Sequence, residues 1–183
     1  MNRTLFLSLS LACLIASHQT HADPIHPIAG GAYWHHDSGW QFPEKCAEFE
    51  RVGIPQDVAG SKDAVAYYAR TVDGSRIVVS VDVYPADSSA AEEMQADGSG
   101  KLSSEGPFEV GTERTLRGTR RIFAADGEKN GLTVLYAFAA GEWRVRIRIA
   151  DANADIAPLL DAFVRDQRWE ALNSDSSIIS STS

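Results

Sequence analysis

A tight turn between two alternating segments constrains the fold of this chain more than any other feature. Ile77, Val79, Val81 and Val83 alternate with polar residues, and this period of two predicts a strand with one buried face. The preceding segment, 64–71, is also typical of a strand. Asp73-Gly74 separates the two and favours the two-residue turn of a β-hairpin, whose central residues need positive φ. The sequence therefore predicts an antiparallel sheet.

A second hairpin is predicted further along the chain. Segments 132–139 and 143–149 are strand-like, and Gly141 lies between them. Apolar residues then follow at helical spacing: Ile156, Leu159, Leu160, Phe163 and Val164. Asp155 can cap this helix, which places Pro158 in the first turn, where a missing N–H costs nothing. The result is a hairpin followed by a helix.

A helix is predicted to follow the first hairpin as well. Pro85 ends its second strand, and 87–96 predicts a helix in which Ser89 and Glu92 have the spacing of a capping box. A hairpin–helix unit thus occurs twice. Duplication of one ancestral unit explains this, and so does convergence of two units on a common motif; the sequence leaves both open.

A further strand over 119–124 completes the predicted sheet. Apolar residues occupy both faces of 132–139, which is typical of a central strand with cover on each side. We therefore expect an α+β fold in which two helices pack on an antiparallel sheet of five or six strands. One domain spans 42–172, preceded by an N-terminal arm over 23–41 without regular elements and followed by a disordered tail over 173–183.

This order of elements resembles the PsbP-like superfamily, in which helices sandwich an antiparallel sheet. The resemblance covers 42–169 and rests on Tyr84-Pro85-Ala86-Asp87 and the two hairpin–helix units. It implies a protein that binds other proteins and not an enzyme. The chain is also similar to exported bacterial proteins that share a Phe-Pro opening, here Phe42-Pro43, and a strand ending in Tyr-Pro-Ala.

The first 22 residues predict export. Met1-Asn2-Arg3 is followed by an apolar run over 5–15 and by Thr20-His21-Ala22, the order of a secretory signal peptide. We expect cleavage before Asp23 and a periplasmic or secreted protein. Cys13 offers the alternative of a lipoprotein signal, but the apolar run continues beyond it, which favours an ordinary signal. No other segment is long and apolar enough to predict a membrane span.

Charge and cysteine content limit the partners. The net charge of −8 disfavours nucleic acid, which repels an acidic chain. Removal of the signal leaves Cys46 alone, so no internal disulfide is expected. Segment 43–49 predicts a short helical turn that points Phe42, Cys46 and Phe49 inward, and a buried cysteine behaves as a small apolar residue.

Histidines in the arm suggest a metal site, but their spacing argues against one. Adjacent side chains of extended backbone point to opposite faces, so His35 and His36 do not converge with His26 and Asp37 on one ion. We therefore predict no metal and no cofactor. Trp34 and Trp40 make this arm a second candidate binding surface.

Arginines stand out against the acidic background. Arg144, Arg146 and Arg148 share one strand face, and further arginines lie on or before the strand expected nearby: Arg114, Arg117, Arg120 and Arg121. One interpretation is a basic stripe that binds carboxylates or phosphates. The other is an ordinary solvent face, with acid partners such as Asp82 or Glu142 on neighbouring strands.

The sequence favours a non-catalytic protein of the cell envelope that binds a protein or an anionic partner. An inhibitor or immunity protein for an exported toxin is one specific version. The rival is a periplasmic hydrolase with an unrecognised site, although no Gly-x-Ser-x-Gly elbow is present. A deep pocket of convergent polar groups with shifted pKa values would favour the hydrolase.

Overall fold

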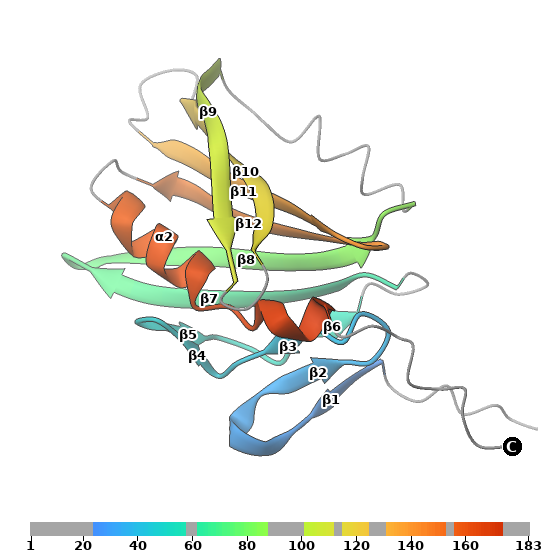
Figure 1. Cartoon of the computed structure of the whole chain (residues 1–183). Coiled ribbons are helices and arrows are strands. Elements are labelled where there is room, and N and C mark those ends of the chain that lie inside the picture. The colour runs from blue at the N-terminus through green and yellow to red at the C-terminus, as the bar shows by residue number, and fades with distance from the viewer. Residues whose placement is uncertain are drawn as a thin grey trace, which may run out of the picture.

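The computed structural model describes residues 24–57, 62–87, 101–111, 115–124, 131–152 and 156–173. The predicted signal peptide lies outside this part, as does the predicted tail beyond Asn173. Of these described residues, 61% lie in strands and 14% in helices, so the fold is mostly β. It contains a large sheet, a small sheet and one α-helix, α2 (Figure 1).

Nine antiparallel strands form the large sheet, in the order β4-β5-β7-β8-β12-β11-β10-β9, with β6 beside β7. Their bounds are β4 Lys45–Cys46, β5 Phe49–Arg51, β6 Gln56–Asp57, β7 Ala64–Val72, β8 Ser75–Pro85, β9 Lys101–Val110, β10 Leu116–Ala124, β11 Leu132–Ala140 and β12 Trp143–Ala152.

Both predicted hairpins are confirmed. β7 and β8 are joined by Asp73 and Gly74, whose φ values of 49° and 79° are both positive, as this turn requires. β11 and β12 turn at Gly141. β11 lies between β10 and β12, so it is a central strand, as its apolar pattern predicts.

The predicted fold class is wrong in strand number and in helix content. The large sheet alone exceeds five or six strands, and α2, Ala157–Arg165, is the one α-helix of the described residues. The other predicted helix, 87–96, falls almost wholly on residues that are not described, as does Asp155; Ile156 holds the N-cap of α2. The missing strands are short ones, or, in β9, a strand too polar to alternate.

The segment predicted as an arm forms a second sheet. β1 Ile25–Pro27, β2 Tyr33–His35 and β3 Gln41–Phe42 are antiparallel, with a short 3₁₀ helix, η1 Ala29–Gly31, between the first two. In Figure 1 this sheet lies below the large one. Segment 43–49 forms the β4–β5 turn and not a helical turn; Ala47 has a φ of 48° there.

Arg51, on β5, joins the two sheets. Its guanidinium donates to the carbonyl oxygens of Phe42 (2.6 Å) and Gly31 (2.7 Å) and lies 4.7 Å from the centre of the Tyr33 ring. Charge-assisted hydrogen bonds of this kind are stronger than neutral ones. The small sheet is therefore fastened to the domain and is not a detached arm.

The core lies between one face of the large sheet and α2, which crosses in front of that face in Figure 1. Leu160, Phe163 and Val164 of α2 are fully buried, as the helical spacing predicts. They share one apolar cluster with the inward side chains of β12: Val145, Ile147 and Ile149. A second 3₁₀ helix, η3 Trp169–Asn173, adds Trp169 to this core.

The outer edge of the large sheet is irregular. β9 pairs with β10, but Ile122 lies opposite Ser104 while Phe123 lies opposite Leu102, so Ser103 is an extra residue that forms a β-bulge. Pro107 also lies in this edge strand. Within the described part of the chain, no helix has the length and apolar character needed to cross a membrane.

Candidate binding face

The strand arginines of β12 lie on the face of the large sheet opposite α2, here called the outer face. Arg144, Arg146 and Arg148 alternate with the buried residues of β12, so they point away from the core. They lie opposite three residues of β8: Tyr84, Asp82 and Ser80. The predicted sharing of one face by these three arginines is thus observed.

Arg146 is part of a compact ion pair. Its Nε lies 3.2 Å from Asp82 Oδ2, and the Ser80 hydroxyl donates to the same oxygen at 3.2 Å. Both charged side chains are only 19% exposed. Burial raises the pKa of Asp82, while Arg146 and Ser80 oppose that shift. Arg146 therefore serves to compensate a largely buried carboxylate.

Most of the other candidate arginines also have partners. Arg117 pairs with Glu109 and Arg121 with Glu105, each at 2.9 Å, and both acids belong to β9. Arg144 donates to the carbonyl oxygens of Gly141 and Trp143. Arg114 lies outside the described residues. The face thus resembles the second interpretation more closely, with cross-strand acid partners that include Asp82 as named above.

Arg120 does not lie on the outer face. It points toward α2 and donates to both carboxylate oxygens of Asp161, at 3.1 and 3.2 Å, while the Tyr136 hydroxyl donates to Asp161 Oδ1 at 2.6 Å. Burial, with the Asp161 hydrogen bond second, raises the pKa of Tyr136. This group ties the helix to the sheet.

A groove of about 500 Å³ opens on the outer face beside the β7–β8 turn. Its lining includes two arginines, one acid and several apolar residues: Arg76, Arg148, Asp73, Tyr67, Val78 and Ile156. Tyr67 is 50% and Val78 41% exposed, which is unusual for large apolar side chains in this protein. Among the residues described, Arg76 has no ion-pair partner. The groove therefore combines cationic and apolar groups that solvent can reach.

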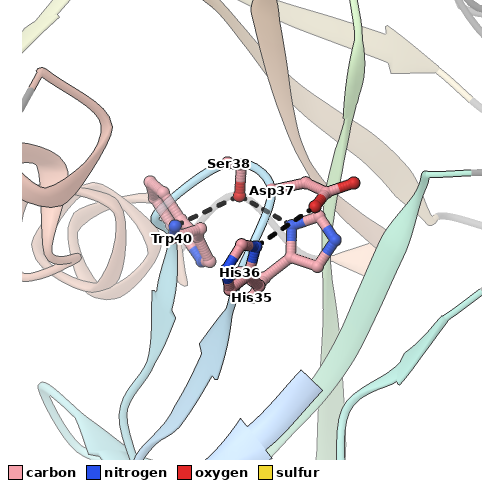
Figure 2. Close-up of polar contacts among 5 residues, drawn as sticks. All are labelled: His35, His36, Asp37, Ser38 and Trp40. Carbon is pink, nitrogen blue, oxygen red and sulfur yellow. Dashed lines mark hydrogen bonds and ion pairs between the residues drawn. The ribbon is translucent and has the colours of Figure 1, made fainter. Parts of the chain in front are cut away.

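The arm's serine and histidine form a hydrogen bond that resembles part of a catalytic arrangement. His35 Nδ1 lies 2.7 Å from Ser38 Oγ, which also accepts from the Trp40 backbone N–H at 3.1 Å (Figure 2). Yet His35 is 0% and Ser38 7% exposed. A nucleophile must reach its substrate, so this pair is better explained as a lock on the β2–β3 turn.

His35 makes stability depend on pH. Burial lowers its pKa below the ordinary 6.5, with His36 acting in the same direction and Asp37 and Asp57 opposing it. The unfolded chain then binds more protons than the folded one below that value, so stability falls as the pH drops through about 6.5. We expect His35→Gln to flatten the fall in unfolding free energy by up to about 1.4 kcal/mol per pH unit, measured by urea denaturation between neutral and mildly acidic pH.

His36→Gln is the matched control, because the His36 side chain is 64% exposed and takes no part in the turn's buried bond. That variant should retain most of the slope of the parent protein, because burial, the largest cause of the lowered pKa of His35, is unchanged. If both variants have the parent's slope, His35 does not cause the pH dependence.

The remaining arm candidates separate into buried and accessible residues. Trp40 is fully buried, 5.1 Å between ring centres from Trp169, so its side chain offers no surface to a partner. Trp34 is half-buried and packs against His26 and His36, with ring centres 5.3 and 5.2 Å away. In the described ranges no three His, Cys, Asp or Glu residues are grouped to hold a metal.

Cys46 is fully buried, in line with its predicted inward position. Its thiol donates to the Phe163 carbonyl at 3.2 Å, and the Gln167 amide donates to its sulfur at 3.0 Å. Burial, with nearby Asp166 second, raises the pKa of this thiol, which disfavours the reactive thiolate. Cys46 therefore packs in the core.

Comparison with known proteins adds no relative to this description. No protein-family model, no curated protein and no solved structure matches the chain. The geometry of the outer face and its groove therefore carries the functional inference.

Proposed function

We propose that this chain is a non-catalytic exported protein that binds a protein or other anionic partner through its outer face, at the groove beside the β7–β8 turn. The single observation that carries the proposal is the groove's composition. Arg76 and Arg148 line the same groove of about 500 Å³ as exposed Tyr67 and Val78. Arginine suits carboxylates and phosphates, and exposed apolar side chains add area to bury.

Several observations favour binding over hydrolysis. Six described groups have clearly shifted pKa values in buried surroundings, and none of them lines the groove: His35, Cys46, Tyr68, Asp82, Tyr84 and Tyr136. The Ser38–His35 bond is enclosed. A hydrolytic site would instead bring shifted groups together where substrate can enter.

The test is capture of partners from an envelope extract by the mature chain, with variants chosen from the ion pairs. Arg76→Gln with Arg148→Gln removes the groove's cations, and we expect capture to be lost and to weaken in the parent protein as salt rises. Arg146 is left intact, because its removal would leave Asp82 buried without its cation.

Arg117→Gln with Arg121→Gln is the control for charge. It removes two positive charges from the same face, at strand β10, where both arginines are already paired. This variant should capture the partner as well as the parent does. Equal capture by the groove variant would contradict the proposal and would turn attention to the surface around Trp34.

A further inference from the structure

The groove exists because two neighbouring strands part. β12 pairs with β8 from Trp143 opposite Pro85 to Ile149 opposite Val79, and there the pairing stops. β12 then stays with β11, but Ile149 and Ala152, the partners of Val134 and Leu132, lie three positions apart, whereas Val134 and Leu132 lie two apart. This is a β-bulge, which bends the strand that carries it. β8 continues to Ser75 with β7 as its sole described neighbour.

The alternation of hydrogen-bonded and non-hydrogen-bonded pairs in the β7–β8 hairpin shows which backbone groups of β8 face the groove. A two-residue turn is closed by a hydrogen-bonded pair, here Val72 and Ser75, so Ser75, Ile77 and Val79 direct their N–H and C=O groups to β7. Arg76 and Val78 direct theirs to the other side. Two residues of β8 therefore present the pattern of a sheet edge inside the groove.

Side chains around this edge alternate in chemistry. Arg76, Val78 and Ser80 lie on the outer face with Arg148, while Ile77 lies on the inner side, where Ile156 closes the groove. A strand laid along β8 would therefore direct alternate residues toward arginines and toward apolar groups. The unpaired part, Ser75–Val78, gives room for about four residues, or about 13 Å.

Net charge favours a short acidic segment over a long polyanion. The chain carries −8 overall, which repels an extended anionic polymer along most of its surface. One or two carboxylates placed at Arg76 and Arg148 meet positive charge locally, within the range over which exposed charges act.

We propose that the groove binds an extended peptide segment as an added strand on β8, with acidic side chains directed to Arg76 and Arg148. This inference rests on the proposed function and names its partner class. Main-chain hydrogen bonds to Arg76 and Val78 would supply affinity, and the arginines and the Tyr67–Val78 surface would supply selectivity.

The experiment is selection from a displayed library of short random peptides with the full mature chain as bait. We expect enriched sequences in which acidic and apolar residues alternate. The best peptide, synthesised with a fluorescent label, should bind with about tenfold weaker affinity for each arginine replaced by Gln, at Arg76 or Arg148, measured by anisotropy. Arg117→Gln with Arg121→Gln should leave its affinity unchanged.

The peptide backbone gives the sharper test, because it does not depend on how a variant folds. Two versions of the peptide would be N-methylated at every second residue, one at the odd positions and one at the even positions. One version should lose binding and the other should retain nearly all of it, since only alternate N–H groups face β8. On the protein side, Val78→Pro removes one donor that faces the groove, whereas β7 keeps its ladder; it should lose peptide binding with a cooperative unfolding transition retained.

Two results would overturn the inference. One is a library without enriched alternating acidic sequences. The other is equal binding of the odd-methylated and even-methylated peptides, which would show that the peptide does not bind as a strand. If the arginine dependence of envelope capture survives either result, the proposed function stands without this inference; if it is also lost, both fail. Binding of poly-L-glutamate but of no short peptide would assign the groove to an anionic polymer instead.

Discussion

Trp40→Ala is expected to lower the free energy of unfolding by about 3–5 kcal/mol. The Trp40 side chain has no exposed surface, and its ring lies between Trp169 of η3 and Phe42 of β3, with ring centres 5.1 and 6.4 Å away. Truncation would leave a large cavity where the small sheet joins the core, because neighbouring rings can relax only partly. Urea denaturation followed by circular dichroism measures the loss.

Trp34→Ala is the matched control on the adjacent part of the same sheet. Trp34 is half-buried and contacts the His26 and His36 rings. Its truncation should cost clearly less, since surface-proximal changes are usually small. Equal losses of unfolding free energy in the two variants would contradict the buried position of Trp40. Both tryptophans would then again be candidates for a binding surface.

Leu160→Ala is expected to cost about 2–5 kcal/mol. Leu160 is fully buried on the face of α2 that packs against the sheet, in one cluster with Val145 and Ile147 of β12. The loss combines the transfer of the leucine side chain with the cavity that remains. Thermal and urea unfolding of the purified variant provide the measurement.

Leu159→Ala compares the same change one residue earlier, where the side chain is only partly buried against the core. A smaller loss is expected there. A melting temperature that Leu160→Ala leaves unchanged would show that α2 contributes nothing to the core. These two variants therefore test the helix orientation as well as its packing.

Local patterns were sufficient to predict the central hairpins and α2. β7, β8, β11 and β12 are each nine residues or longer and rich in strand-forming residues, β8 and β12 alternate clearly, and the tight turns contain glycine. α2 carries apolar residues at helical spacing over its whole length. In these elements, the sequence pattern and the burial required by the fold agree.

The remaining strands lack such a pattern for physical reasons. β1 to β6 have only two or three residues each, too few to show a period, and long-range contacts such as those of Arg51 hold them. β9 is an edge strand whose first residues, including Leu102, are exposed on both sides. A strand segment exposed on both sides has no apolar face, so its sequence lacks the alternation by which a strand is predicted.

The strand β9, which the sequence pattern did not predict, holds the acidic partners of two candidate arginines. Glu105 and Glu109 belong to β9, so omitting that strand left Arg117 and Arg121 without their partners. The groove could not be predicted either, because it depends on a bulge in β12 and on the unequal lengths of β8 and its partner. Such registers are set by the assembled sheet, and no short segment encodes them.

The bulge at Ser103 has a consequence for how molecules of this protein meet. An unbroken outer strand is a template on which a second sheet can grow, and stacking of that kind leads to aggregation. β9 interrupts its own edge at Ser103, adds Pro107, which has no N–H to offer, and begins with the charged Lys101. β9 is thus a poor template for an added strand from a second copy of the chain, which disfavours aggregation through this edge.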